Sequence, residues 1–354
     1  MKLTVYGPQR LGLVIDEKVV DLERATGVYL SSDKGSTRPS EEAEELVGHT
    51  FGAFVSLGET ALQTAHNVFE FAKDDLNGMK GLQGEQIVFP MGQVPLRAPV
   101  TESSKFKIMC IGANFADHLL GLYSNLPAAV GEEKEAHTLE GAKAEALSTP
   151  QWGFYKLGSN VSNPGEEIQY PSRTKLLDYE GEIALIIGKR GKDIKRSDLL
   201  DYVFGYTLFN DFSMRDNFDK GSLNFARIKN FQGSGALGPV VTLKDEAPDP
   251  QDIDFSTSVN GEVRQRGNTR DMIRGFGEWV EFLSSDAHLN PGDIIASGTP
   301  SGTAVDSSKR NSDGSLPRDR FLKVGDVVEV SSMKIGGILR NKIVAKPETA
   351  LHLG

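Results

Sequence analysis

Short β-type runs recur throughout the C-terminal two thirds of this chain, and they limit the folds that it can adopt. From Lys105 onward, apolar runs are separated by glycine and proline: KIMCIG, EIALIIG, VFGYTLF, GPVVTL, DIIASG and VVEVSS. One helix, predicted over 269–285, interrupts them. Short strands punctuated by turn residues favour a β-rich domain over alternating βαβ units.

The first hundred residues predict a smaller unit that mixes helices and strands. The segment Leu11–Leu22 is typical of a β-hairpin, with a turn at Glu-Lys. Helices are predicted from near Ser40 and over Glu59–Leu76, where apolar residues recur at three-to-four spacing. The segment 88–100 contains three prolines and is interpreted as a linker.

These patterns predict an α+β protein that is mainly β. We expect a small N-terminal α+β domain over 1–100 and a larger domain over 101–354. Two segments of the larger domain, at about 124–150 and 305–320, depart from the strand pattern and are interpreted as insertions. Such excursions form lids or binding loops in some proteins and inert surface loops in others.

The charge and cysteine content exclude some classes of protein. The chain has 49 acidic and 39 basic side chains, and a net charge of −10 argues against nucleic acid or an anionic membrane as the main partner. Cys110 is the only cysteine, so no intramolecular disulfide can form. The sequence shows neither the apolar run of a signal peptide nor the roughly 20 apolar residues of a membrane span. We expect a cytoplasmic protein.

An acidic cluster stands at the start of one predicted strand. In the segment DYEGE, alternation along a strand would place Asp178, Glu180 and Glu182 on one face, with neighbours roughly 7 Å apart. A fully apolar run follows and implies burial. Buried like charges repel each other unless a cation neutralises them. An acidic strand edge that faces solvent would give the same pattern.

A further carboxylate, Asp211, ends the apolar run FGYTLF. It lies beside Asn210, and it could belong to an active site or serve as an ordinary turn or helix cap. Oxygen ligands without an accompanying cysteine favour Mg²⁺ or Mn²⁺, with Ca²⁺ as another candidate. Such a site leaves positions for water and for substrate oxygens.

Three other segments carry side chains that suit catalysis. His118 follows a glycine-started turn, where it could act as a general base, although a surface histidine fits the same sequence. Lys229 precedes a glycine-rich turn and could face an oxyanion, or it could be a solvated loop lysine. The segment SGTPSG after DIIA could bind a carboxylate through its backbone amides or close a hairpin.

The order and spacing of these segments together resemble the fumarylacetoacetate hydrolase family. The resemblance covers roughly residues 105–346, and the N-terminal hundred residues resemble a small extra domain that some members carry. The matching segments follow the order CIGANFADH, FYKLGSNVSNPGEEI, LDYEGEIALIIGK, FGYTLFNDFSMRD, KNFQGSGALGPVV, TRDMI, LNPGDIIASGTPSG and FLKVGDVVEV.

The resemblance implies a fold, an assembly and a metal site. The family fold is a mixed β-sandwich roll, and its members are usually homodimers. Their E-x-E strand and the aspartate that follows it bind Mg²⁺, and these roles fall on Glu180, Glu182 and Asp211.

The resemblance also implies catalytic and substrate-binding residues. The family's general base falls on His118, and Lys229 falls beside metal and substrate. Thr299 and Lys156 match residues near the family's substrate. Arg215 is a further candidate substrate contact and could instead orient the preceding aspartate of its segment, Asp211.

The sequence departs from the family pattern at two positions. Many smaller members have a glutamate three residues after the histidine, which forms a water-activating dyad, whereas this chain has Gly121. In fumarylacetoacetate hydrolases proper, this glutamate comes from elsewhere in the chain. A replacement could also come from the neighbouring insertion, for example from Glu132, Glu133 or Glu135, and the sequence does not distinguish these three. Many relatives also have K-x-F-D-T after the lysine, and here Gln232-Gly233 occupies the last two places.

These residues predict Mg²⁺-dependent hydrolysis of a carbon–carbon bond in a 1,3-dioxo acid such as an acylpyruvate, as in aromatic or sugar-acid catabolism. The alternative is isomerisation, decarboxylation, hydration or dehydration of a 2-oxo or 2-hydroxy-dienoic acid through the same enolate. Gly121 favours the alternative, because the usual water-activating dyad is incomplete. A non-enzymatic binding protein on the same scaffold is the third hypothesis.

Overall fold

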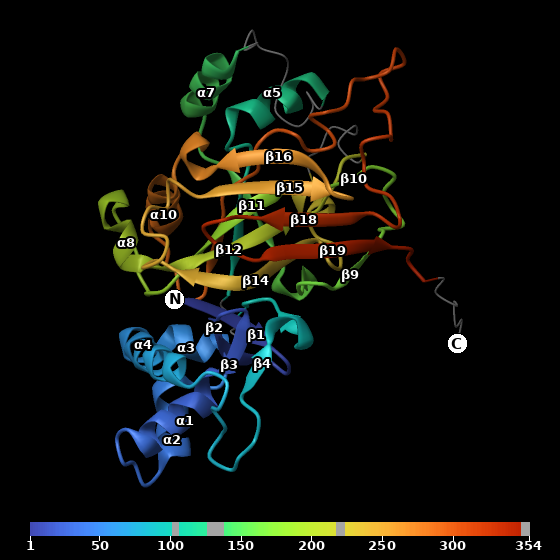
Figure 1. Ribbon diagram of the computed structural model, residues 1–354. Coiled ribbons are helices and arrows are strands. Elements are labelled where there is room, and N and C mark those ends of the chain that lie inside the picture. The colour runs from blue at the N-terminus through green and yellow to red at the C-terminus, as the bar shows by residue number, and fades with distance from the viewer. Residues whose placement is uncertain (101–105, 126–137, 217–223, 348–354) are drawn as a thin grey trace, which may run out of the picture.

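The computed structural model describes residues 1–100, 106–125, 138–216 and 224–347, and within them two β-sheets pack face to face. A smaller unit of helices and strands lies at one end of this sandwich (Figure 1). The expected α+β fold is confirmed. In the part of the chain that the structure describes, no helix combines the length and the apolarity that a membrane span requires.

The N-terminal unit begins with an antiparallel meander of β1 (Lys2–Tyr6), β2 (Arg10–Ile15) and β3 (Lys18–Asp21). The predicted hairpin is confirmed, although its turn falls on Asp16 and Glu17. Both residues have positive φ angles, 47° and 57°, as the tight turns of two-residue hairpins require.

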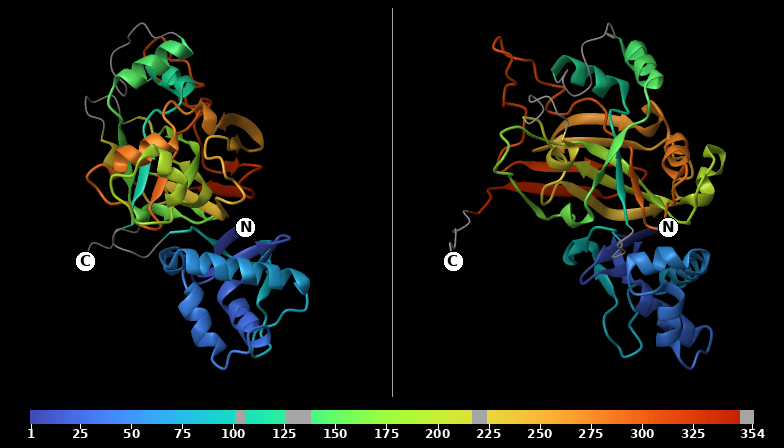
Figure 2. Two further views of the ribbon diagram at one scale, coloured as in Figure 1. Left: turned by 90° about the vertical axis from the view of Figure 1, so that its left-hand side faces the viewer. Right: turned by 180° about the vertical axis from the view of Figure 1, so that it is seen from behind.

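Four helices of the N-terminal unit pack on one another and on its strands (Figure 2). The two predicted helices are confirmed as α2 and α4, whereas α1 and α3 were not predicted. The predicted linker is wrong in part, because it contains a short 3-10 helix and two strands that pair with β3 and β1. The bounds are α1 (Leu22–Ser32), α2 (Pro39–Val47), α3 (Phe51–Leu57), α4 (Glu59–Asp74), β4 (Val88–Pro90), η1 (Met91–Gln93) and β5 (Leu96–Arg97).

The large sheet continues from the N-terminal unit into the rest of the molecule. Strand β1 pairs with β14, with Lys2 opposite Thr242, so the first strand of the chain extends the main sheet. The strand order is β4-β3-β2-β1-β14-β12-β11-β17-β6-β7, with β5 beside β1 and β8 beside β14. The domain boundary near residue 100 stays a prediction. The remaining strands are β6 (Ile108–Ile111), β7 (Gly153–Lys156), β8 (Val161–Ser162), β11 (Gly181–Ile187), β12 (Val203–Asp211), β14 (Gly235–Leu243) and β17 (Ile294–Ala296).

Strand β11 lies in the middle of this sheet and is buried on both faces. Ile183, Leu185 and Ile187 pack into the core between the two sheets, whereas Ala184 and Ile186 pack into the core shared with the N-terminal unit. Side chains alternate along a strand, so only a continuous apolar run can fill two cores at once. This explains the apolar sequence that follows the acidic segment.

The second sheet covers one face of the first and has the order β16-β15-β18-β19-β9. Its alternate residues, such as Val328 and Val330 of β18, join the core between the sheets. The bounds are β9 (Glu167–Gln169), β15 (Asp254–Val259), β16 (Glu262–Asn268), β18 (Val327–Ser331) and β19 (Ile338–Val344).

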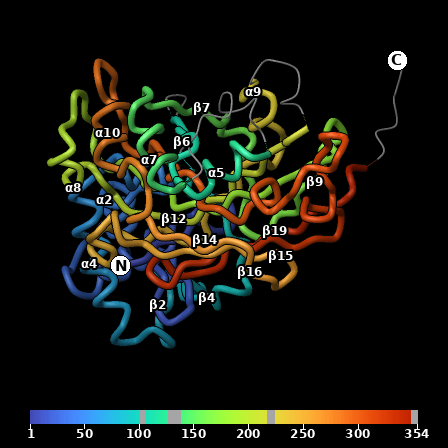
Figure 3. Tube along the Cα trace, turned by 90° about the horizontal axis from the view of Figure 1, so that it is seen from above, coloured from blue at the N-terminus to red at the C-terminus, as the bar shows by residue number. Residues whose placement is uncertain are grey.

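Helices α5 (Ala116–Asn125) and α7 (Leu139–Ser148) pack together at the end of the sandwich away from the N-terminal unit (Figures 1 and 3). The predicted helix over 269–285 is wrong in its first half, because a short 3-10 helix precedes α10 (Phe276–Ser284). The predicted insertion at 305–320 contains turns but no helix or strand. The other short elements are η2 (Gly158–Asn160), β10 (Leu177–Asp178), η3 (Arg196–Asp198), α8 (Leu199–Tyr202), β13 (Ser213–Met214), α9 (Phe225–Ile228) and η4 (Thr269–Asp271).

Candidate active site

The antiparallel pairing of β11 with β12 brings three carboxylates together. The register places Gly181 opposite Asn210, and the backbone N–H of Asp211 donates to the carbonyl of Glu180 at 2.8 Å. Side chains that lie opposite each other on paired strands have Cβ atoms about 5 Å apart, so they meet. One carboxylate oxygen from each of Glu180, Glu182 and Asp211 lies within 4.8 Å of the other two.

The acidic segment is divided between two strands, which separates Asp178 from these carboxylates. Strand β10 ends at Asp178 and pairs with β13, whereas β11 begins at Gly181. The prediction that three acidic side chains share one face of one strand is therefore wrong. The Asp178 carboxylate accepts hydrogen bonds from the backbone N–H groups of Ala304 (2.7 Å) and Val305 (3.2 Å) and from Nε of Arg215 (3.0 Å). It orders the segment after β17.

Three buried basic side chains surround two of the clustered carboxylates. Lys229 Nζ donates to Glu180 at 2.6 Å and to Asp211 at 2.9 Å. Lys156 Nζ lies 2.7 Å from the other oxygen of Asp211 and donates to the carbonyl of Lys229. Arg215 forms an ion pair with Glu180. Its contacts do not support the alternative role of orienting Asp211.

The third carboxylate of the cluster, Glu182, has no basic partner among the described residues. It accepts a hydrogen bond from the backbone N–H of Gly298 at 3.0 Å. The buried carboxylates of this cluster and its neighbour outnumber the buried lysines and arginines by one: Asp178, Glu180, Glu182 and Asp211 against Lys156, Arg215 and Lys229. Buried charge without compensation is costly. Hard oxygen donors with an excess of negative charge fit a divalent cation, and Glu180, Glu182 and Asp211 are the residues that would hold it.

The pKa values of the cluster move in opposite directions. Burial raises the pKa of Glu182 well above its usual range, and the charges of Asp211 and Glu180 raise it further. Burial would also raise the pKa of Glu180, but the charges of Lys229 and Arg215 outweigh it and lower that pKa below its usual range. Burial lowers the pKa of Lys229, yet its carboxylate neighbours hold it above the ordinary value. Glu182 is thus the ligand whose charged form most requires the metal.

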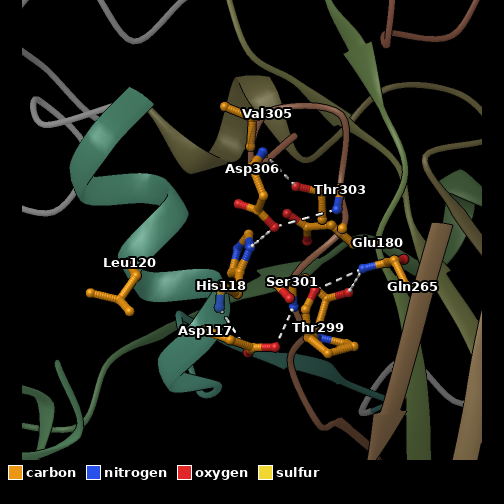
Figure 4. A network of polar contacts seen from close by, with 12 residues as sticks. Asp117, His118, Leu120, Glu180, Gln265, Thr299, Ser301, Thr303, Val305 and Asp306 are labelled. Atoms are coloured by element: carbon orange, nitrogen blue, oxygen red, sulfur yellow. Dashed lines mark hydrogen bonds and ion pairs between the residues drawn. The ribbon is translucent and has the colours of Figure 1, made fainter. Parts of the chain in front are cut away.

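His118 lies on α5 and is oriented by an aspartate from far along the chain. Its Nδ1 lies 2.8 Å from Oδ2 of Asp306, and both side chains are only 5% exposed (Figure 4). Burial lowers the pKa of His118, but the charge of Asp306 and its hydrogen bond outweigh burial and raise the pKa above the ordinary value. Because Nδ1 faces Asp306, Nε2 is the ring nitrogen that remains for proton exchange.

Six of the predicted site residues line one small cavity of about 40 Å³: His118, Glu180, Glu182, Arg215, Lys229 and Thr299. Asp211 and Lys156 do not line this cavity, but both contact Lys229, which does. The Thr299 hydroxyl donates to the carbonyl of Gly181 (2.9 Å) and accepts from Gln265 (2.8 Å), so it is already engaged.

An aromatic wall of Trp152, Phe154 and Phe225 closes one side of this cavity, and the sequence did not predict it. The rings of Phe154 and Phe225 stack with centroids 5.2 Å apart, and Lys229 Nζ lies 5.1 Å from the Phe154 centroid. Trp152 also borders a neighbouring cavity of about 420 Å³ beneath α5 and α7. The two cavities share Gly112, Ala113 and Trp152, so the larger cavity adjoins the one that contains the carboxylates.

Asp306 is the site residue that sequence reasoning missed. It lies in the segment predicted as an inert or lid-like insertion, 188 positions from His118, and no local motif marks it. The candidates Glu132, Glu133 and Glu135 lie outside the described residues. Gln232, the other departure from the family pattern, is exposed and does not line the catalytic cavity.

The fold is a two-sheet roll, and its site combines a buried carboxylate cluster, Lys229 and a histidine hydrogen-bonded to an aspartate. Together they indicate a class of enzyme. The family model described as fumarylacetoacetate (FAA) hydrolase C-terminal matches residues 107–344, two thirds of the chain. The chain therefore belongs to the fumarylacetoacetate hydrolase family, as the sequence predicted, and is an enzyme of that superfamily.

Relatives across this family differ in the reactions that their names describe. The oxaloacetate tautomerase YisK of Bacillus subtilis is 32% identical over 344 residues, which cover 96% of this chain and 97% of that protein. The 2-hydroxyhepta-2,4-diene-1,7-dioate isomerase structure from Mycobacterium marinum is 27% identical, with a TM-score of 0.55, over 74% of this chain and 82% of that one. A maleylpyruvate hydrolase structure from Sphingobium sp. SYK-6 has a TM-score of 0.66 at 24% identity, over 98% and 100% of the two chains. At that identity the hydrolase likeness concerns the fold.

Proposed function

We propose that this enzyme interconverts the keto and enol forms of a small 2-oxo dicarboxylic acid of the oxaloacetate class, with a divalent metal. The observation that carries the proposal is one candidate base, His118, which is hydrogen-bonded to Asp306 and lines the same small cavity as Lys229 and carboxylates of the cluster. Tautomerisation needs one group that moves a proton and a positive site that stabilises the enolate. The full-length similarity to an oxaloacetate tautomerase supports the same choice.

The proposed reaction moves a proton between carbon and oxygen. Nε2 of His118 removes a proton from C3, the electron pair of that C–H bond forms the C2–C3 double bond, and the C2 carbonyl oxygen gains the negative charge. The ammonium of Lys229 stabilises this charge, and returning the proton to oxygen gives the enol. A divalent cation on Glu180, Glu182 and Asp211 would supply further positive charge and chelate the substrate oxygens. Mg²⁺ or Mn²⁺ is the proposed ion.

A second candidate is hydrolysis of a carbon–carbon bond in a 1,3-dioxo acid. One observation favours it: Asp306 supplies a carboxylate partner to His118, so Gly121 no longer argues against water activation. Hydrolysis would need water bound opposite the distal carbonyl and room for a larger acyl group. Tautomerisation is preferred because the relative that matches almost the whole chain at 32% identity is named an oxaloacetate tautomerase.

The two reactions give different isotope patterns. With Mg²⁺ or Mn²⁺ and little buffer, the enzyme is expected to accelerate loss of the enol absorbance of oxaloacetate, to exchange C3 hydrogen with deuterated water, and to lose both activities with EDTA. An acylpyruvate in ¹⁸O-labelled water separates hydrolysis, since only hydrolysis places the label in a new carboxylate. Labelled product without enol turnover would overturn the tautomerase proposal.

The homodimer implied by the resemblance also stays a prediction. Light scattering, which measures the molar mass in solution, tests it.

Substituting His118 with alanine is expected to slow turnover by on the order of 10²–10⁴-fold, the usual contribution of a general base. Metal affinity should change little, because the imidazole forms no hydrogen bond with the three proposed metal ligands among the described residues. Mn²⁺ titration of both proteins measures the affinity. The exposed His66 on α4 provides the matched control, and His66→Ala should leave both quantities unchanged. Undiminished turnover in His118→Ala would contradict the proposed role.

The rate should also depend on pH with a defined sign. Only the neutral imidazole can accept a proton, and the charge of Asp306 raises the pKa of His118 above the ordinary value of about 6.5. Turnover should therefore rise with pH and level off above that raised pKa. The pH profile of kcat/KM tests this, because it reports ionisation in the free enzyme. A rate that is flat across neutral pH would argue that another group moves the proton.

A further inference from the structure

Position 121 explains how an aspartate from another segment reaches His118. Gly121 lies three residues after His118 on α5, and positions three apart on a helix are neighbours on its surface. A Cβ atom added at Gly121 would lie 2.5 Å from Oδ1 of Asp306 and 2.8 Å from its Cγ. Real Cβ atoms do not approach other atoms so closely. The Asp306 carboxylate therefore occupies the space that a side chain at position 121 would fill.

The segment that delivers Asp306 is fixed at several points (Figure 4). Oδ2 of Asp306 accepts from the backbone N–H of Thr303 at 3.3 Å, and the Thr303 hydroxyl accepts from the backbone N–H of Asp306. Asp117, the residue before His118, accepts from the N–H of Ser301 at 3.2 Å. The Asp178 carboxylate accepts hydrogen bonds from the next two backbone N–H groups of the segment, those of Ala304 and Val305. The aspartate is thus presented by an ordered turn.

We propose that Asp306 is the positioning residue for His118 and that the missing side chain at Gly121 is what admits it. This chain has its acid partner for His118 on the turn after β17, and position 121 on α5, where the family pattern has a glutamate in many smaller members, is glycine. The inference rests on the proposed function only in assigning the proton transfer to His118. Asp306 holds the imidazole so that Nε2 faces the cavity, and its carboxylate contacts the ring that gains a proton at Nε2.

The other charged groups around the imidazole define what Asp306 contributes. Glu180 favours the protonated ring and Arg215 opposes it, so these two fixed charges act in opposite directions. Asp306 is the group that hydrogen-bonds the ring. Its second oxygen, Oδ1, has no hydrogen-bond partner among the described residues and points to the space beside Gly121.

Moving the carboxylate from the turn to the helix tests the proposal. Asp306→Ala should lower kcat by on the order of 10²-fold with little change in KM. Gly121→Glu alone should lower both kcat and the melting temperature, because the new side chain collides with Asp306. The double variant Gly121→Glu/Asp306→Ala should recover at least tenfold over Asp306→Ala and should melt above Gly121→Glu. The matched control Gly121→Gln/Asp306→Ala has the same size without the charge and should stay slow.

NMR titration of the His118 ring gives a readout that does not depend on the substrate. The chain has six histidines, and His118→Asn identifies the signal. With Mg²⁺ present, the pKa of His118 should fall in Asp306→Ala and return toward the wild-type value in Gly121→Glu/Asp306→Ala, but not in the Gln control. If the folded Glu and Gln double variants have the same rate and the same His118 pKa, the proposal is overturned. If the pKa pattern holds but no variant turns over oxaloacetate, the proposed function fails and the pairing stands.

Discussion

Replacing Glu182 with glutamine is expected to abolish tight metal binding and to slow turnover by on the order of 10³-fold. Glu182 is the buried ligand without a basic side chain beside it, so the metal is its expected counter-charge. Glutamine keeps the shape and one acceptor oxygen but removes the charge. A loss of several kcal/mol of transition-state stabilisation, about 1.4 kcal/mol for each factor of ten, gives that magnitude.

The same substitution should leave the metal-free protein folded, because the burial that raises the pKa of Glu182 opposes its charged form. Thermal unfolding with and without Mn²⁺ measures both effects. The wild type should be stabilised by about 2.7 kcal/mol when the metal is at 100 times its Kd, and Glu182→Gln should show little of this gain. Glu70→Gln on α4, far from the site and exposed, is the control. A normal metal-dependent gain in Glu182→Gln would remove Glu182 from the ligand set.

Replacing Lys229 with methionine is expected to reduce stability and catalysis through two separate effects. Without metal, the change leaves Glu180 and Asp211 without the ammonium that contacts both, and breaking a buried ion pair costs about 3–5 kcal/mol. Saturating Mg²⁺ should restore much of this stability, because the ion supplies the missing positive charge. Catalysis should stay slow by on the order of 10²-fold or more, because the enolate oxygen has lost a donor.

Denaturant unfolding of the metal-free and Mg²⁺-loaded proteins separates these effects. Lys143→Met on α7, an exposed lysine, is the control and should change neither stability nor rate. A Lys229→Met protein that is equally destabilised with and without Mg²⁺ would show that the lysine acts by packing against Phe154 and not by charge. Full activity in the Mg²⁺-loaded variant would exclude Lys229 from enolate stabilisation.

Local patterns predicted many elements of the fold. The hairpin near Asp16, the helices α2 and α4, and the buried strands of the large sheet follow from periodicity and turn residues that act over a few positions. The errors occur where tertiary contacts override such patterns. The segment DYEGE forms two strands because β10 pairs with β13 and β11 pairs with β12. The segment 269–285 begins as a 3-10 turn that Asn268 caps.

The site shows the same contrast between what local patterns predict and what tertiary contacts decide. The sequence identified a histidine, a lysine and three carboxylates as candidates, because their types and order match a family. It could not find Asp306, since the contact with His118 spans 188 positions and depends on the turn after β17. From the sequence, Gly121 indicated an incomplete dyad. In the folded chain, the Asp306 carboxylate occupies the space beside Gly121 and completes the dyad with His118.

The sequence by itself determined the β-rich architecture, the family and the chemical types available to the site. The register of β11 against β12 decided which carboxylates meet, and the packing of α5 against the segment after β17 decided which acid orients His118. The physical reason is range. Propensity, alternation and turn chemistry act between neighbours along the chain, whereas charge pairing and steric exclusion in a buried site act between atoms a few ångströms apart, whatever their separation in sequence.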